Sequence, residues 1–250
     1  MKEKIKIYVA AHKKFDFVFP DIYCPMHVGK EGKKSLGYKG DNTGDNISNK
    51  NASFCELTGM YWIWKNSKYD IVGLVHYRRW FYNSIFSSKK KVLSESNIKK
   101  ILNKYDIIVA PKGYTWKSTV YDQYKNNHFI DDLEKCHNIL KEKYPEYEQS
   151  YQKIMYGNCY SPLNMVITYK KIFDEYCEWL FNILFELEKQ IDLSKRDSYN
   201  MRVFGFLSER LFNVWLDKNN QYKIIEKPVL NIEKNVLKQR IQHIVKKVIK

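Results

Sequence analysis

The sequence predicts an α/β fold in which helices cover both faces of a mainly parallel central sheet. Short apolar runs rich in β-branched residues predict buried strands, and longer amphipathic patterns between them predict helices. The two kinds of segment alternate through most of the 250 residues, and 44% hydrophobic residues argue against disorder. A chain of this length can form one large α/β domain with a small appendage, which we place at residues 1–231 and 232–250.

The first half of the chain is predicted to alternate strands with helices around one long loop. Residues 20–51 are loop-like and dense in turn formers, and a loop of this length usually has a function. Ser53 is expected to cap the helix that follows, with Glu56 at the capping-box spacing, and Ser94 to cap the next helix. In order, we expect a strand at 5–11, a helix at 53–65, a strand at 70–75, a helix at 94–104 and a strand at 106–110.

The second half is predicted to be mainly helical. Pro145 separates two helices, and the long helix at 170–190 carries an apolar stripe at helical spacing. We expect helices at 121–144 and 146–155, a strand at 163–168, and helices at 170–190 and 203–216.

Charge and cysteine content narrow the class of protein. The net charge of +15 predicts an anionic partner: nucleic acid, anionic lipid or a phosphorylated small molecule. The five cysteines are scattered singly, which is typical of neither a zinc site nor a disulfide framework and favours a reducing cytoplasm. No apolar run approaches the ~20 residues that cross a bilayer, and we expect no signal peptide.

The stretch DIVGLVHYRRWF, residues 70–81, is the most informative of the sequence. Its apolar run predicts a buried strand, and Arg78 and Arg79 follow at the carboxyl end, where open α/β sheets bind ligands. Two guanidiniums there suit a phosphate or diphosphate, because each can donate two parallel hydrogen bonds. The alternative is a solvated arginine pair. No P-loop and no dinucleotide-binding glycine motif is present, which disfavours NTPases and dehydrogenases.

Seven blocks of the sequence resemble a bacterial family, domain of unknown function 4422, whose members occur among capsular and surface polysaccharide synthesis proteins. The blocks are KIYVAAHK (6–13), DIYCPMHVG (21–29), GDNTGDNIS (40–48), FCELTGMYWIWKN (54–66), GLVHYRRWF (73–81), SPLNMVI (161–167) and FGFLSERLFNVWL (204–216). The resemblance implies a glycosyltransferase with a GT-A-like nucleotide-sugar fold over about residues 4–231. Some members are regarded as galactofuranosyltransferases that use a UDP-sugar donor.

The resemblance directs attention to the donor site. GT-A enzymes usually carry an Asp-x-Asp motif that holds a divalent metal on the donor diphosphate, and here His76, Tyr77, Arg78 and Arg79 stand in its place. We expect Arg78 and Arg79 to bind the diphosphate without a metal or other cofactor. His76 is a candidate third donor; alternatively it is a core histidine bonded to a backbone carbonyl.

Four further residues are candidates for donor binding. By its place at the end of the first strand, His12 would lie near the nucleotide, and the small Ala10 and Ala11 would let the backbone approach the base. Asn164 resembles an asparagine that lies beside the donor sugar in related folds. The alternative for each is a buried structural role.

The acidic loop GDNTGDNIS, residues 40–48, offers hydrogen-bonding groups for sugar hydroxyls of donor or acceptor. The alternatives are a plain set of turns or a metal-chelating loop. The candidate residues are Asp41, Asn42, Thr43, Asp45 and Asn46.

Glu209 is our candidate for the catalytic base that takes the proton from the acceptor hydroxyl. It lies in an apolar, aromatic helix where desolvation would raise its pKa, and its position resembles the late acidic helix of many GT-A enzymes. The alternative is an ion pair with Arg210 or Arg202.

Residues 232–250 predict a basic amphipathic helix that lies in an anionic membrane interface. The alternatives are a helix packed on the domain or a coiled-coil partner helix. The membrane interpretation fits a polyprenyl-linked or other glycan acceptor at the inner face of the cell membrane, so we expect a cytoplasmic, peripherally associated protein.

Two other functions stay open. A sugar-phosphate transferase of surface polymer synthesis would also use an arginine cluster and a nucleotide-sugar donor. A nucleic-acid-binding protein would explain the positive charge, but no recognition motif is present, so we expect no nucleic acid partner.

Overall fold

The computed structural model describes residues 3–16, 19–83, 92–231 and 233. The strands are β1 (Ile5–Ala11), β2 (Tyr23–His27), β3 (Lys39–Gly40), β4 (Ile71–His76), β5 (Arg79–Phe81), β6 (Ile107–Val109), β7 (Gly113–Tyr114), β8 (Cys159–Tyr160), β9 (Val166–Tyr169), β10 (Ile224–Glu226) and β11 (Val229–Asn231). The helices are α1 (Asn51–Phe54), α2 (Leu57–Asn66), α3 (Glu95–Leu102), α4 (Val120–Lys125), α5 (Ile130–Lys143), α6 (Glu148–Met155), α7 (Lys170–Glu188) and α8 (Val203–Lys218), with 3-10 turns η1 (Ser48–Lys50), η2 (Pro145–Tyr147) and η3 (Asn200–Arg202).

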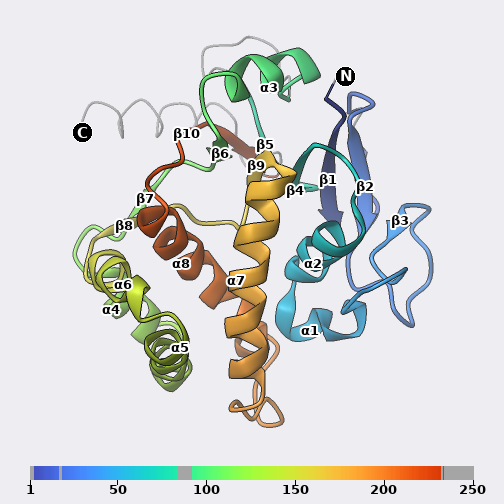
Figure 1. Ribbon diagram of the computed structural model, residues 1–250. Coiled ribbons are helices and arrows are strands. Elements are labelled where there is room, and N and C mark those ends of the chain that lie inside the picture. The colour runs from blue at the N-terminus through green and yellow to red at the C-terminus, as the bar shows by residue number, and fades with distance from the viewer. Residues whose placement is uncertain (1–2, 17–18, 84–91, 232, 234–250) are drawn as a thin grey trace.

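A twisted central sheet organises the molecule (Figure 1). Its strand order is β10-β6-β9-β4-β1-β2-β3, while β5 pairs with β4 and β11, and β7 and β8 form a separate pair. The contacts from β4 through β1 and β2 to β3 are parallel, as is β10 with β6; β9 runs antiparallel to both of its neighbours. The prediction of an α/β fold with a mainly parallel sheet is therefore confirmed.

Alternation along β1 supplies a hydrophobic core to each face of the sheet. Tyr8 and Ala10 belong to the larger core, with residues of α2, α5, α7 and α8, whereas Ile7, Val9 and Ala11 belong to the smaller core, with residues of α3 and β11. Successive strand side chains point to opposite faces, so one strand serves both layers. In Figure 1, α7 crosses the near face of the sheet and α3 lies at its upper end.

The sequence prediction for the first long helix is wrong in one respect that affects the site. The helix is interrupted, because Cys55 adopts φ 52° between α1 and α2. Ser53 lies inside α1 and Glu56 makes no capping hydrogen bond, so this predicted capping box does not form. The cap at Ser94 is confirmed: its side chain accepts from the Asn97 backbone.

Two predicted segments contain structure that the sequence pattern did not indicate. The loop at 20–51 includes β2, whose five residues contain Pro25, and a proline lowers the strand signal. The predicted helix at 121–144 is divided into α4 and α5 around residues 126–129. The strands β5, β10 and β11 have three residues each, which is too short for a periodic pattern.

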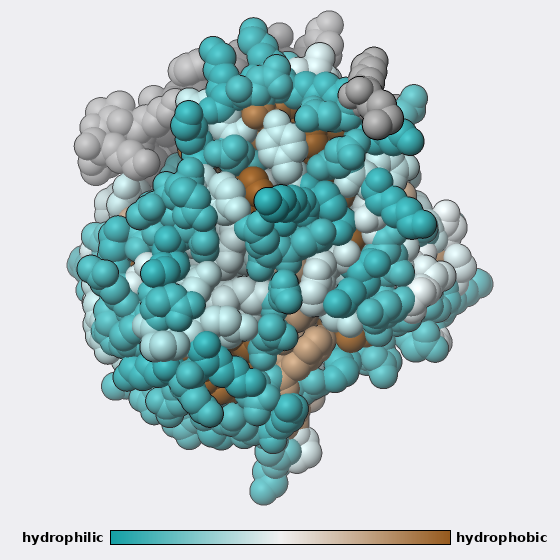
Figure 2. Space-filling view, in the orientation of Figure 1, coloured by the Kyte–Doolittle hydropathy of each residue, from teal (hydrophilic) through white to brown (hydrophobic). Residues whose placement is uncertain are grey.

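The tail predicted as an amphipathic helix, residues 232–250, lies outside the described residues except for Glu233. In the part of the chain that the structure describes, no helix has the length and apolarity to cross a lipid bilayer. The face seen in Figure 2 is largely hydrophilic, and hydrophobic residues show through only in small separate areas.

Candidate active site

A pocket of about 700 Å³ lies at the carboxyl ends of β1 and β4, beside α1 and the start of α8. It brings together residues that are far apart in the sequence. Six of them are predicted site residues: Ala10, His12, His76, Arg78, Arg79 and Glu209. The other lining residues are not among those predicted from the sequence: Val28, Asn51, Ala52, Cys55, Glu56, Tyr77, Leu163, Ser198, Met201 and Arg202.

The two arginines have different surroundings. Arg78 donates from Nη1 to Glu233 Oε2 at 2.9 Å, and both side chains are partly exposed. Arg79 begins β5 opposite His76, and no carboxylate of the described residues is within ion-pair distance of it. Burial, followed by the Arg78 charge, lowers the pKa of Arg79 from its ordinary value. Arg79 therefore presents a half-buried cation to the pocket, and an anionic ligand would compete with Glu233 for Arg78.

His76 is tied to the backbone. Its Nε2 lies 2.7 Å from the carbonyl oxygen of Leu163, and a carbonyl only accepts, so Nε2 carries the proton. Burial lowers the pKa of His76 and favours the neutral ring, whose Nδ1 is then an acceptor. The neutral His76 ring therefore has no N–H left to donate to a diphosphate. The geometry agrees with the alternative, a histidine bonded to a backbone carbonyl.

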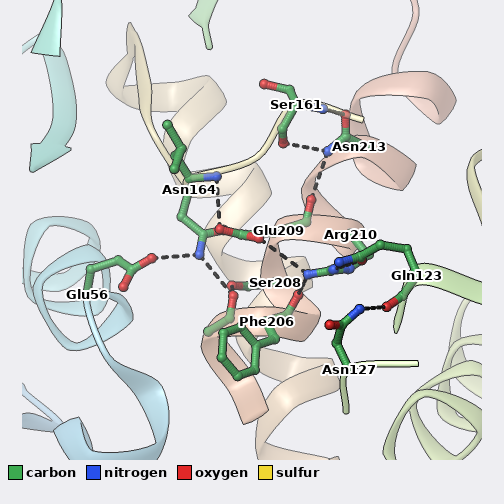
Figure 3. A network of polar contacts seen from close by, with 12 residues as sticks. Glu56, Gln123, Asn127, Ser161, Asn164, Phe206, Ser208, Glu209, Arg210 and Asn213 are labelled. Atoms are coloured by element: carbon green, nitrogen blue, oxygen red, sulfur yellow. Dashed lines mark hydrogen bonds and ion pairs between the residues drawn. The ribbon is translucent and has the colours of Figure 1, made fainter. Parts of the chain in front are cut away.

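A two-residue turn holds three side chains of the site. Leu163 and Asn164 have φ of 88° and 48°, a region that costs non-glycine residues about 1–3 kcal/mol each. The Leu163 N–H donates to Glu209 Oε1 at 3.0 Å, while its carbonyl accepts from His76. The Asn164 amide donates to Glu56 Oε1 at 2.9 Å and to the Gly205 carbonyl at 3.2 Å (Figure 3). The strained turn thus fixes Glu56, His76 and Glu209 relative to one another.

Asn164 itself is buried and does not line the pocket. Its Oδ1 has no hydrogen-bond partner among the described residues. The amide therefore supports the Glu56 carboxylate from inside the protein.

Glu209 lies in the pocket, as expected of a catalytic base, and also forms an ion pair with Arg210, the alternative given by the sequence. Its carboxylate lines the pocket, and its Oε2 lies 3.3 Å from Nη1 of the buried Arg210. Arg210 is held in turn by the Phe206 carbonyl and by Gln123 (Figure 3). Burial raises the pKa of Glu209 above its ordinary value, against the effect of the Arg210 charge. Arg202 does not pair with Glu209; its Nε contacts Cys55 Sγ at 3.4 Å.

Glu56 is the acidic residue that sequence reasoning missed. It lines the pocket from the interruption between α1 and α2, and the turn at Cys55 directs it there. A cysteine is not a residue that favours positive φ, so the pattern predicted a continuous helix. The only signal in the sequence was its place inside the block FCELTGMYWIWKN.

The end of the first strand contributes Ala10 to the pocket, and the residue after the strand, His12, also lines it. Burial lowers the pKa of His12, and its ring packs edge-on against Tyr77. Ala11 points to the other face of the sheet and is buried in the smaller core. The carbonyl of Ala10 accepts from Tyr77 N and that of Ala11 from Val28 N, so the protein already uses both acceptors expected near the base.

The acidic loop lies outside the pocket lining. Asp41 is fully buried, and its carboxylate accepts from the backbone of Gly29 and Lys30 and from the hydroxyls of Ser48 and Thr58. A carboxylate with these four donors has no capacity left for a sugar hydroxyl. The prediction of sugar binding by Asp41 is therefore corrected to a structural role.

Its neighbours also bond within the protein. Thr43 accepts from the Trp62 indole, Asp45 accepts from the Tyr61 hydroxyl, Asn46 donates to the Gly44 carbonyl, and Asn42 donates weakly to Glu31.

The donor set does not fit a divalent metal. Glu56 and Glu209 are the pocket's carboxylates, and each already accepts a hydrogen bond from the turn at 163–164. Within the described ranges, no three His, Cys, Asp or Glu side chains gather in a way that could hold a metal ion.

Comparison with known proteins relates the chain to glycosyltransferases. The chain is 33% identical to a solved structure described as a WbbM bifunctional glycosyltransferase in its apo form, with a TM-score of 0.86. The similarity covers 92% of this chain and 46% of that one, so this chain spans about half the length of that protein. No curated protein is significantly similar to this chain. The model of one family, described as Domain of unknown function (DUF4422), matches residues 6–220, and the chain therefore belongs to this family.

Proposed function

We propose that this protein is a glycosyltransferase that moves a sugar, galactofuranose being our candidate, from a UDP-sugar to a glycan or lipid-linked acceptor in surface polysaccharide synthesis. The similarity to a bifunctional glycosyltransferase supports the class of reaction. The observation that carries the proposal is one pocket that holds two groups: the guanidinium of Arg79, which pairs with no carboxylate of the described residues, and the partly buried carboxylate of Glu209.

The two groups match the two charges that a displacement at the anomeric carbon develops. The acceptor oxygen forms a bond to that carbon as the bond to the diphosphate oxygen breaks, and UDP leaves with the bonding electron pair. Arg79, and Arg78 once it leaves Glu233, would stabilise the charge that grows on the diphosphate. Glu209 would take the proton of the acceptor hydroxyl, and a raised pKa suits that task near neutral pH.

The binding step requires Arg78 to give up its ion pair with Glu233. Arg78 then exchanges one anionic partner, Glu233, for another, and exposed ion pairs of this kind are weak because water screens them. His12 and Ala10 border the same end of the pocket, which is where we expect the nucleoside.

The test compares wild type with Glu209→Gln. We expect the variant to bind UDP as wild type does and to lose transfer by roughly 100-fold or more, the usual contribution of a general base. UDP affinity is measured by calorimetry and transfer by product mass, which also separates sugar transfer from sugar-phosphate transfer. Near-normal turnover in the variant would remove Glu209 from its role, and a wild type that neither binds UDP nor consumes any UDP-sugar would refute the function.

A further inference from the structure

A cluster of stacked rings adjoins the pocket at the part formed by η3 and α8. The ring of His128 lies 4.1 Å from that of Phe206 and 5.6 Å from that of Tyr199, in near-parallel orientation, and Tyr199 lies 5.1 Å from Phe206. Phe206 is one helical turn before Glu209 (Figure 3), while Ser198, Met201 and Arg202, which flank Tyr199, line the pocket itself.

The Tyr199 ring is exposed although its backbone is held firmly. Half of its surface, 49%, is open to solvent. The carboxylate of Asp197 accepts hydrogen bonds from the backbone N–H groups of Tyr199, at 2.8 Å, and Asn200, at 2.9 Å. Exposing a large aromatic ring forfeits the hydrophobic stabilisation that burial would give, whereas a ring held in place binds a ligand with little loss of conformational freedom.

Hydrogen-bond donors lie next to the rings. The guanidinium of Arg202 is 5.1 Å from the Phe206 ring centre, and its Nε is the donor that contacts Cys55. Among the described residues, its two terminal nitrogens make no hydrogen bond or ion pair. A flat apolar ring beside free donors matches a sugar, whose ring has a C–H face and a rim of hydroxyls.

We propose that Tyr199, supported by His128 and Phe206 and flanked by Arg202, forms the subsite that binds the acceptor sugar. The inference rests on the proposed function, because it takes Glu209 as the group that receives the acceptor proton. The acceptor hydroxyl must reach Glu209, and Phe206, which contacts the other two rings, shares α8 with that residue. The arginines and His12, in contrast, follow β4 and β1. A uracil base would instead lie with the diphosphate cations.

The experiment uses the full chain and the variants Tyr199→Ala, Tyr199→Leu and Tyr199→Phe. Release of UDP from UDP-galactofuranose, UDP-galactopyranose and UDP-glucose is followed first in water alone, and then with octyl glycosides of galactose, glucose and N-acetylglucosamine. Tyr156→Ala is the matched control, because Tyr156 is similarly exposed, at 58%, and stacks on Tyr121 away from the pocket lining.

For the donor and glycoside that wild type uses best, we expect Tyr199→Ala and Tyr199→Leu to raise the glycoside KM by about tenfold, the loss of one aromatic contact. The Kd for UDP and the rate of donor hydrolysis in water should stay within about twofold of wild type. Tyr199→Phe and Tyr156→Ala should behave as wild type, because one keeps the ring and the other lies elsewhere.

An unchanged glycoside KM in both the alanine and leucine variants would overturn the subsite. A rise in the UDP Kd as large as the rise in KM would also overturn it, because the ring would then bind the nucleotide. Hydrolysis of a UDP-sugar that no glycoside accelerates would count against the subsite and leave the proposed function standing. A wild type that consumes no UDP-sugar would overturn both.

Discussion

At the scale of single residues, the site depends on two carboxylates held at different points of one network. Glu209 is fixed by the Leu163 N–H and by Arg210, and Glu56 by the Asn164 amide. After burial, the Glu56 charge is the largest influence that raises the pKa of Glu209. We therefore propose that Glu56 is a positioning residue, whose charge would keep Glu209 basic enough to take a proton.

The first prediction concerns the pH dependence of turnover. Glu56→Gln removes a negative charge near Glu209 but keeps an oxygen for the Asn164 amide, so Glu209 should lose its proton more easily. A base is active when deprotonated, so the acidic limb of the kcat profile should move to lower pH. The measurement is kcat against pH for wild type, Glu56→Gln and the exposed control Glu31→Gln. An acidic limb that stays in place would show that Glu56 does not tune Glu209.

At the scale of elements, the loop at 41–48 is a brace for the sheet edge and α2. Asp41 ties β3 to the turn after β2, to η1 and to Thr58 of α2. The sequence indicated that this loop has a purpose, and the contacts show that Asp41 serves the fold.

The second prediction separates a role of Asp41 in stability from a role in sugar binding. Asp41→Asn replaces an acceptor oxygen by an N–H group that faces the existing donors, and each buried donor left unpaired costs about 1–3 kcal/mol. The free energy of unfolding should fall by at least about 2 kcal/mol in a urea titration. Asp45→Asn, which keeps an acceptor for the Tyr61 hydroxyl, should change it much less. If Asp41→Asn kept full stability but lost acceptor affinity, the sugar-binding interpretation would be right after all.

The sequence predicts an element well when the residues of that segment alone determine its structure, and poorly when distant contacts determine it. The strand at 5–11 is confirmed residue for residue, because hydrophobic side chains fill both of its faces. The arginines after β4 also lie where a strand's carboxyl end would put them. Glu56 and the turn at Leu163 were not predicted, because Cys55, Leu163 and Asn164 take backbone conformations that the tertiary contacts impose.

At the scale of the whole molecule, the surface charge and the tail carry the expectation of membrane association. The net charge is +15, and the tail beyond Glu233 adds six of the chain's basic residues: Lys234, Lys238, Arg240, Lys246, Lys247 and Lys250. Each lysine or arginine near the surface of an anionic leaflet contributes about 1 kcal/mol to the free energy of membrane binding.

The third prediction tests that expectation. Removing residues 234–250 keeps Glu233 and its pair with Arg78, so turnover of a soluble glycoside should be unchanged. Sedimentation with vesicles of phosphatidylglycerol and phosphatidylcholine should be lost, whereas pure phosphatidylcholine vesicles should bind neither form. Equal sedimentation of both forms with anionic vesicles would assign membrane binding to the rest of the chain or to neither part.

Guanidiniums at the end of β4 are proposed to anchor the donor diphosphate without a metal, and calorimetric binding of UDP in EDTA tests this most directly. We expect wild type to bind UDP in EDTA, and Arg79→Ala to weaken binding by about tenfold or more, since a hydrogen bond to a charged group contributes about 1.5–3 kcal/mol. Arg79→Lys should keep only part of the affinity, because the lysine ammonium lacks the planar pair of donors of a guanidinium. The control Lys112→Ala changes an exposed lysine outside the lining of this pocket and should have no effect. UDP binding that disappears in EDTA and returns with Mn²⁺, or that is indifferent to Arg79→Ala, would contradict the claim.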